Sequence, residues 1–198
     1  MTSLSLRLRQ FRADQDAVAA IEFAIVLPFM LLLCIGGVEL GNALAINVKL
    51  TETVHTVADI VSQNKCVTTS DVSGILAASS KVLAPYDVTN AVVTVSEVQP
   101  NGDGLTGKVI WSQSLNGTAR TPSSNVTLPT SLQGVPTTAG LILGEATYFY
   151  TPNLGYTISG TVALGDAYYL FPRQTDFVPT LTSGQTTPQA PGTSCPTS

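Results

Sequence analysis

An acidic residue, Glu22, lies near the beginning of a long apolar run in this chain of 198 residues. A single carboxylate within a lipid bilayer costs on the order of 2 to 3 kcal/mol on insertion scales, so such a group is expected to have a partner or a function. Glu22 could lie near the membrane surface and remain hydrated, since Arg12 precedes it by about two or three helical turns. Alternatively, it could pair with a positive charge, which would offset the cost of burial.

The sequence contains no pattern typical of an enzyme active site. It has neither a nucleophile elbow nor a phosphate-binding loop, and its single histidine, His55, lies on the polar side of a predicted helix. Its three cysteines do not have the spacing of zinc ligands. The net charge of −4 argues against nucleic acid as a partner. We therefore expect a protein that is not an enzyme and that uses no cofactor or metal.

Two of the cysteines could form a disulfide. Cys66 and Cys195 would both lie outside the membrane, whereas Cys34 lies within the apolar run and is expected to pack there. In an oxidising compartment, a bond between Cys66 and Cys195 would tie the C-terminal tail to the first helix. The alternative is a pair of free thiols.

The element that would position Glu22 is a membrane helix predicted over residues 17–41. Such a helix would be about 37 Å long, which exceeds the ~30 Å hydrocarbon core of a bilayer. Arginines precede it in a basic leader, residues 1–16, and no lysine or arginine follows until Lys49. This charge pattern predicts a cytoplasmic N-terminus and an exported remainder. Pro28 is tolerated inside such a helix.

A cleavable secretory signal would also show arginines followed by an apolar run, and Ala43-Leu44-Ala45 resembles its cleavage site. However, this run is long for a signal and contains both Glu22 and Pro28. Apolar residues at near-helical spacing also continue past the site: Leu40, Leu44, Val48, Val54, Val57, Ala58 and Val61. We therefore predict one retained helix that leaves the membrane as an amphipathic stem over residues 42–65.

Beyond the stem, residues 66–173 have the pattern of an α+β head. A second helix is expected to be capped by Ser70 and to end before Pro85. Segments rich in β-branched and aromatic residues predict an antiparallel sheet of about four strands: 87–98, 107–114, 141–151 and 156–171. Residues 174–198 are rich in proline, threonine and serine, so they are expected to form a flexible tail.

The stretch AVAAIEFAIVLPFMLLLCIGGVELGNA, residues 17–43, resembles the N-terminal signature of the TadE-like family. In that family Glu-Phe-Ala leads into an apolar helix with Leu-Pro, matched here by Glu22-Phe23-Ala24 and Leu27-Pro28. Later stretches also resemble related chains: 109–120, 148–160 and 167–173. The resemblance implies a pilin-like (pseudopilin) component of tight-adherence (Flp) pilus biogenesis, with a helix-plus-sheet plan similar to that of pilins.

The resemblance also implies a processing site and an assembly contact. Prepilin peptidases leave the glutamate fifth in the mature chain, so the cut would fall between Ala17 and Val18, with alanine where the family usually has glycine. Glu22 would then neutralise the N-terminal amine of a neighbouring subunit. We expect Glu22, Phe23 and Pro28 to be assembly contacts.

The expected location is the bacterial inner membrane, crossed once, with a periplasmic head. The expected partners are the lipid bilayer, other pilin-like subunits, the inner-membrane pilus assembly machinery and a prepilin peptidase. Incorporation into the surface pilus is left open. An alternative is an exported binding or adhesion module, either released after Ala45 or simply anchored in the membrane.

Overall fold

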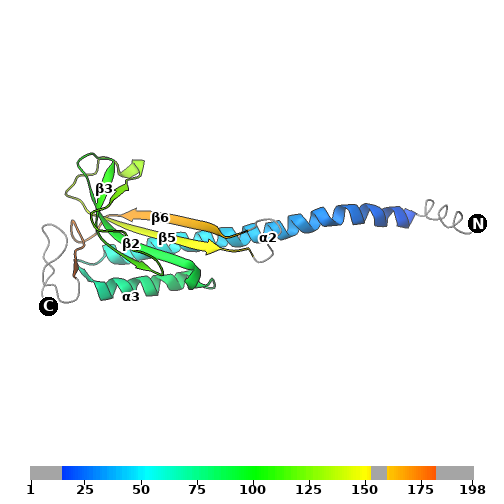
Figure 1. Ribbon diagram of the computed structural model, residues 1–198, viewed down its shortest axis with the longest axis horizontal. Coiled ribbons are helices and arrows are strands. Elements are labelled where there is room, and N and C mark those ends of the chain that lie inside the picture. The colour runs from blue at the N-terminus through cyan, green and yellow to red at the C-terminus, as the bar shows by residue number, and fades with distance from the viewer. Residues whose placement is uncertain (1–14, 153–159, 182–198) are drawn as a thin grey trace, which may run out of the picture. The chain divides into compact units, whose positions relative to one another are not determined.

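The computed structural model describes residues 15–152 and 160–181 (Figure 1). The chain divides into two compact units. One contains the residues up to Asn42 together with Thr151–Thr161, and the other contains Ala43–Tyr150 and the residues from Val162 onward. The second unit holds the sheet and is called the head below.

A single helix, α2 (Gln15–Ser62), contains both the predicted membrane run and the predicted stem. It includes Pro28 and continues without a break through Ala43-Leu44-Ala45, where a signal peptidase would cut. Proline is accommodated because only one backbone hydrogen bond is lost at that position. The long N-terminal apolar helix predicted from the sequence is confirmed.

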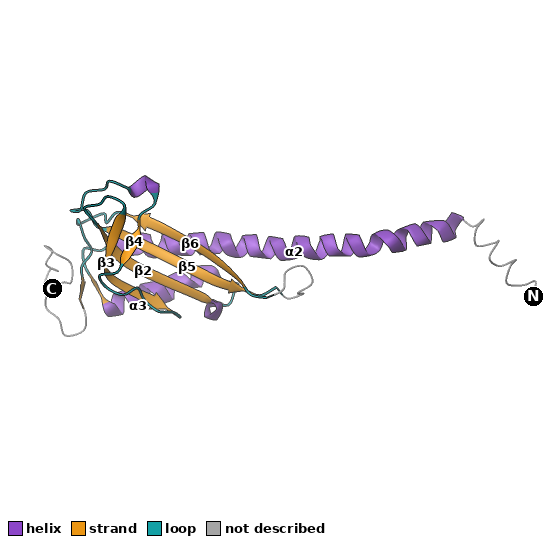
Figure 2. Cartoon of the chain, turned by 45° about the horizontal axis from the view of Figure 1, so that its top comes forward, coloured by secondary structure: helices purple, strands orange, loops and turns teal. Residues whose placement is uncertain are grey.

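The head has an antiparallel sheet of five strands in the order β4-β3-β2-β5-β6 (Figure 2). The strands are β2 (Ala91–Pro100), β3 (Thr106–Leu115), β4 (Asn125–Thr127), β5 (Leu141–Tyr150) and β6 (Val162–Leu170). The α+β class is therefore confirmed. The fifth strand, β4, lies between the predicted strands 107–114 and 141–151. The sequence does not predict it, because three residues are too few to show a period of two.

The second helix, α3 (Thr69–Ser79), begins two residues earlier than a cap at Ser70 predicts. Its N-cap is Thr68, not Ser70: the Thr68 hydroxyl accepts a hydrogen bond from the Asp71 N–H at 3.1 Å, and the Thr68 N–H donates to the Asp71 carboxylate at 2.8 Å. This reciprocal pair is a capping box, which satisfies two backbone donors that helix formation leaves exposed. The hydrogen bonds from Thr68 lower the pKa of Asp71.

The main core of the head lies where the stem part of α2 and α3 pack against one face of the sheet. The buried side chains from α2 are Ile46, Leu50, Val54, Val57, Ala58 and Val61, and they meet Val93, Val95, Trp111, Ile142 and Ala146 from the sheet. Gly144 on β5 allows the closest approach, because a Cβ there would lie 2.7 Å from the carbonyl oxygen of Val54. A smaller cluster contains residues of β2, β3, β4 and β5 together with Leu128, which follows β4: Val98, Val109, Val126, Leu128, Leu141 and Leu143.

A segment that we call the C-terminal strap, residues 171–181, follows β6 and packs into the head. Its last two residues form β7 (Thr180–Leu181), which pairs in parallel with β1 (Val67–Thr68). Phe177 and Val178 are buried. Part of the stretch that the sequence assigns to a flexible tail, residues 174–181, is thus packed, and residues 182–198 lie outside the described residues.

Candidate functional site

The N-terminal part of α2 exposes an almost unbroken set of large apolar side chains. It includes Val18, Ile21, Phe23, Ile25, Val26, Leu27, Phe29, Met30, Leu31, Leu32, Leu33, Val38 and Leu40. In the part of the chain that the structure describes, α2 is one helix long and apolar enough to cross a membrane by length and composition. Such a surface is stable only when lipid or other apolar helices cover it.

The predicted processing and assembly residues lie on this helix. Val18 and Glu22 are four residues apart, so they lie on the same side of α2, one turn from each other. Glu22 is exposed and Phe23 is 60% exposed, so both can contact a neighbouring molecule. The bond between Ala17 and Val18 lies within the first turn of α2, and the side chain of Ala17 lies outside the described residues.

A second acid on α2 differs from Glu22 in its environment. Glu39 is 3% exposed, although its neighbours Val38 and Leu40 are each 57% exposed. The sequence shows Glu39 only as a charge near the far end of the apolar run, and its burial has no sequence signal. The two acids that flank the run therefore occupy different surroundings.

The stem carries two apolar rows rather than the single stripe that the sequence indicates. Ile46, Leu50 and Val54 are buried beneath the sheet, whereas Leu44 and Val48 are 59% and 56% exposed. The two rows occupy different sides of α2, because residues two positions apart point about 200° apart around a helix. The exposed row extends the apolar surface of α2 into the head.

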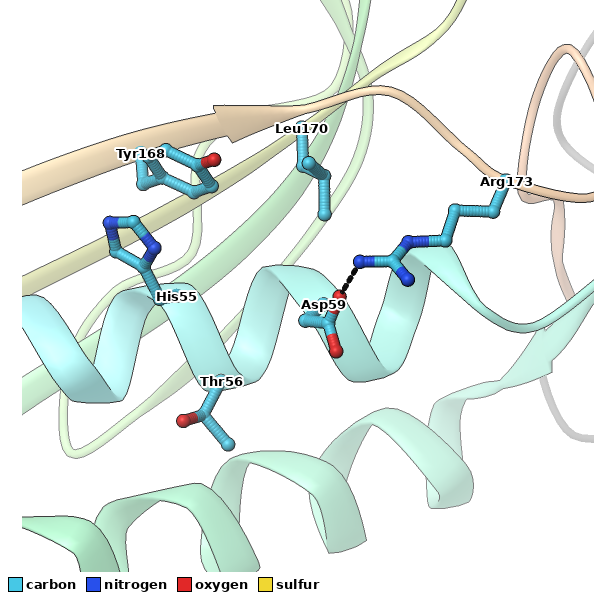
Figure 3. Close-up of a pocket in the computed structure, with 6 residues that line it drawn as sticks. All are labelled: His55, Thr56, Asp59, Tyr168, Leu170 and Arg173. Atoms are coloured by element: carbon cyan, nitrogen blue, oxygen red, sulfur yellow. Dashed lines mark hydrogen bonds and ion pairs between the residues drawn. The ribbon is translucent and has the colours of Figure 1, made fainter.

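The single histidine joins α2 to the edge strand β6. The His55 ring stacks on the Tyr168 ring with centroids 3.7 Å apart, and both line an open pocket of about 330 Å³ (Figure 3). Arg173 forms an ion pair with Asp59 at one side of this pocket, as the dashed line in Figure 3 shows. Because these groups already bind each other, we assign the pocket a role in holding β6 to the stem.

A bidentate ion pair lies on the opposite face of the sheet. Arg120 donates from Nε and Nη2 to the two carboxylate oxygens of Glu145 on β5, each at 2.6 Å. Its backbone N–H also donates to the Ser112 hydroxyl at 3.0 Å. The hydrogen bonds with Glu145 raise the pKa of the Arg120 guanidinium. This pair fastens the long loop after β3 to the sheet.

The structure also reveals a buried acid that the sequence does not indicate. Glu97 on β2 is fully buried, and its two oxygens accept hydrogen bonds from the Trp111 indole at 2.9 Å and from the Val178 N–H at 2.5 Å. The indole N–H also donates to the Val178 carbonyl at 2.9 Å. Burial raises the pKa of Glu97 to about 8, although both hydrogen bonds act in the other direction.

The described half of the predicted disulfide lies beside the strap. The Cys66 sulfur is 3.3 Å from the carbonyl oxygen of Pro179. Cys195 lies outside the described residues, so the pairing of Cys66 with Cys195 remains a prediction. Among the described residues there is no group of three or more histidine, cysteine or acidic side chains that could hold a metal ion.

The fold and the exposed helix define a class of protein in which one apolar, membrane-compatible helix continues into an α+β head. Residues 17–59 match the family described as TadE-like protein, and this range covers all of α2 except its first two and last three residues. This match confirms the resemblance over those residues and supports a protein associated with the tight-adherence pilus. No curated protein and no solved structure matches the chain.

Proposed function

We propose that this protein is a membrane-anchored, pilin-like component of tight-adherence pilus biogenesis, with a structural rather than an enzymatic role. The observation that carries the proposal is the coincidence of two independent results. The TadE-like match spans residues 17–59, and the same residues lie on one uninterrupted helix whose first part is apolar and exposed.

The apolar part of α2 serves as the anchor. Its exposed side chains can be covered by lipid before assembly and by neighbouring helices afterwards, since both surroundings are apolar. The arginines that precede the helix favour a cytoplasmic N-terminus, so the head lies in the periplasm of a bacterial cell. The protein crosses the inner membrane once in this arrangement.

Glu22 provides the polar contact in an otherwise apolar assembly surface. After cleavage between Ala17 and Val18 by a prepilin peptidase, the new amine is a cation that the Glu22 carboxylate of a neighbouring subunit can pair with. A carboxylate and an ammonium group that neutralise each other are tolerated in an apolar environment far better than either alone. The requirement for pairing also fixes the axial register of neighbouring helices, with Phe23 and Pro28 close to the contact.

The experiment compares Glu22→Ala with a matched control, Glu52→Ala, in cells that make the pilus. Glu52 is an exposed acid on the same helix, 49% exposed and paired with Lys49. We expect both variants to insert in the membrane and the Glu22→Ala protein alone to be lost from the assembled fraction. Normal incorporation of the Glu22→Ala protein would contradict the assigned role of Glu22.

A further inference from the structure

The buried carboxyl group of Glu97 has a place in the head that the pilus proposal does not use. It lies between β2 and the C-terminal strap, where one oxygen accepts the Val178 N–H and the other accepts the Trp111 indole N–H. Gly140 lies against the same group, because a Cβ on this residue would be 3.2 Å from Oε1 of Glu97. Glu97 therefore joins three segments that are distant in the sequence.

The surroundings of Glu97 provide no counter-charge. Its hydrogen-bond donors, Trp111 and Val178, are uncharged, as is the nearby Gly140, and no ion pair with Glu97 occurs within residues 15–152 and 160–181. The other charged side chains on the packed elements are Lys108 on β3, Glu145 on β5, and Arg173 and Asp176 on the strap. Lys108 and Asp176 are exposed, while Glu145 and Arg173 are bound to Arg120 and Asp59.

Several contacts hold the strap to the head, and Glu97 is the one at its buried part around Val178. Elsewhere the strap is held by the Arg173 N–H, which donates to the Ser62 carbonyl at 2.9 Å, by the ion pair of Arg173 with Asp59, and by the Gln174 side chain, which donates to the Gln63 carbonyl at 2.7 Å. The Gly140 N–H donates to the Asp176 carbonyl at 2.7 Å, and β7 pairs with β1. An anion at Glu97 would be buried without a cation, a state that costs several kcal/mol and that movement of the strap would relieve by admitting water.

We propose that Glu97 is a proton-dependent latch: it holds the C-terminal strap against the sheet while it carries a proton, and loss of that proton releases the strap. The side chain is neutral in the closed head, which accords with its full burial. Release would uncover Trp111, Phe177 and Val178 while leaving the five-stranded sheet and α2 in place. The latch therefore controls whether Val178 stays packed against Trp111, whose indole donates to the Val178 carbonyl in the closed head.

The protein contains its own reporter, because Trp111 is its single tryptophan and is 3% exposed. We would record the tryptophan emission of the full chain in mild detergent from about pH 6 to about pH 9.5, and far-UV circular dichroism in parallel. The expected result is a shift to longer wavelength with a midpoint near pH 8 and little loss of ellipticity. Emission that does not change across this range would overturn the proposal.

Four variants identify the titrating group. In Glu97→Gln the emission should be independent of pH, whereas Cys66→Ser and His55→Gln should keep the transition of the original protein. Gly140→Ala should give the long-wavelength emission at every pH, because its Cβ would lie 2.7 Å from the Asp176 carbonyl oxygen and force the strap away. If Glu97→Gln does not fold, Gly140→Ala still tests the latch. A transition that persists in either Glu97→Gln or Gly140→Ala would overturn it.

Discussion

The carbonyl oxygen of Val54 on α2 lies close to the backbone of Gly144 on β5. A Cβ atom at position 144 would be only 2.7 Å from this oxygen. The obstructing atom belongs to the helix backbone, so it cannot move aside as a flexible side chain would. The backbone of the stem therefore packs directly against the backbone of β5.

Gly144→Ala tests this contact. The added methyl group must push the stem away from β5, and overpacking of this kind costs about 1–3 kcal/mol in the free energy of unfolding. The matched control is Gly74→Ala on α3, where a Cβ would meet nothing within 4 Å. That change should stabilise the head by about 0.5–1 kcal/mol, because glycine is unfavourable inside a helix. Thermal unfolding of both variants gives the answer, and equal stability would contradict the close approach.

Thr68→Ala tests the capping box of α3. Loss of the Thr68 hydroxyl should cost about 1 kcal/mol in the free energy of unfolding. The pKa of Asp71 is lowered in the folded state, so its contribution is present above its ordinary value of 3.8 and is lost as the pH falls below it. Ser70→Ala is the control, since Ser70 is exposed and is not the cap. A larger loss of unfolding free energy for Ser70→Ala than for Thr68→Ala would show that Ser70 is the N-cap, as the sequence predicts.

The pH dependence of unfolding should carry the signature of Glu97. Unfolded Glu97 loses its proton near 4.5, while the folded protein keeps it until about pH 8. The unfolded state therefore binds fewer protons between these values, and the free energy of unfolding falls as the pH rises, by up to about 1.4 kcal/mol per pH unit. The measurement is chemical unfolding at several pH values for the original protein and for Glu97→Gln. If the difference in free energy of unfolding between the two proteins did not change with pH, Glu97 could not be a buried acid that stays neutral in the folded state.

The ion pair between Arg120 and Glu145 should make a small, salt-sensitive contribution. The side chains are 38% and 27% exposed, so solvent screens the pair, and a double-mutant cycle with alanine should give about 0.5–1 kcal/mol of coupling. The pair of Lys49 and Glu52, which are 36% and 49% exposed with a single contact, should give less. Coupling for the exposed pair that equals or exceeds that of the bidentate pair would show that the two-fold contact adds nothing.

The sequence predicts which helices and strands form better than it predicts where a helix begins or how the elements contact one another. The apolar run and the β-branched segments are long, periodic patterns, so α2 and the strands β2, β3 and β5 are recovered nearly at their observed bounds. The position of the cap was missed because Thr68 and Ser70 are both acceptable N-caps, and only the reciprocal bond with Asp71 distinguishes them.

The buried polar groups could not be predicted for a different reason. Glu97 lies on β2, and no neighbouring residue in the sequence indicates that Trp111 and Val178 will enclose its side chain. Its partners are brought together by the sheet and the strap, which is a property of the tertiary fold. By contrast, Glu22 is conspicuous because it interrupts a local apolar pattern, and its exposed position on α2 leaves it available for the contact that we propose.

The mature N-terminus of the protein recovered from membranes tests the central claim most directly. Peptide mass spectrometry would identify the first residue of the chain that carries the head. Our account predicts a start at Val18, which keeps α2 whole and places a free amine one helical turn from Glu22. A start at Ile46 would contradict it, because the apolar helix would then be a discarded signal and the head a released protein.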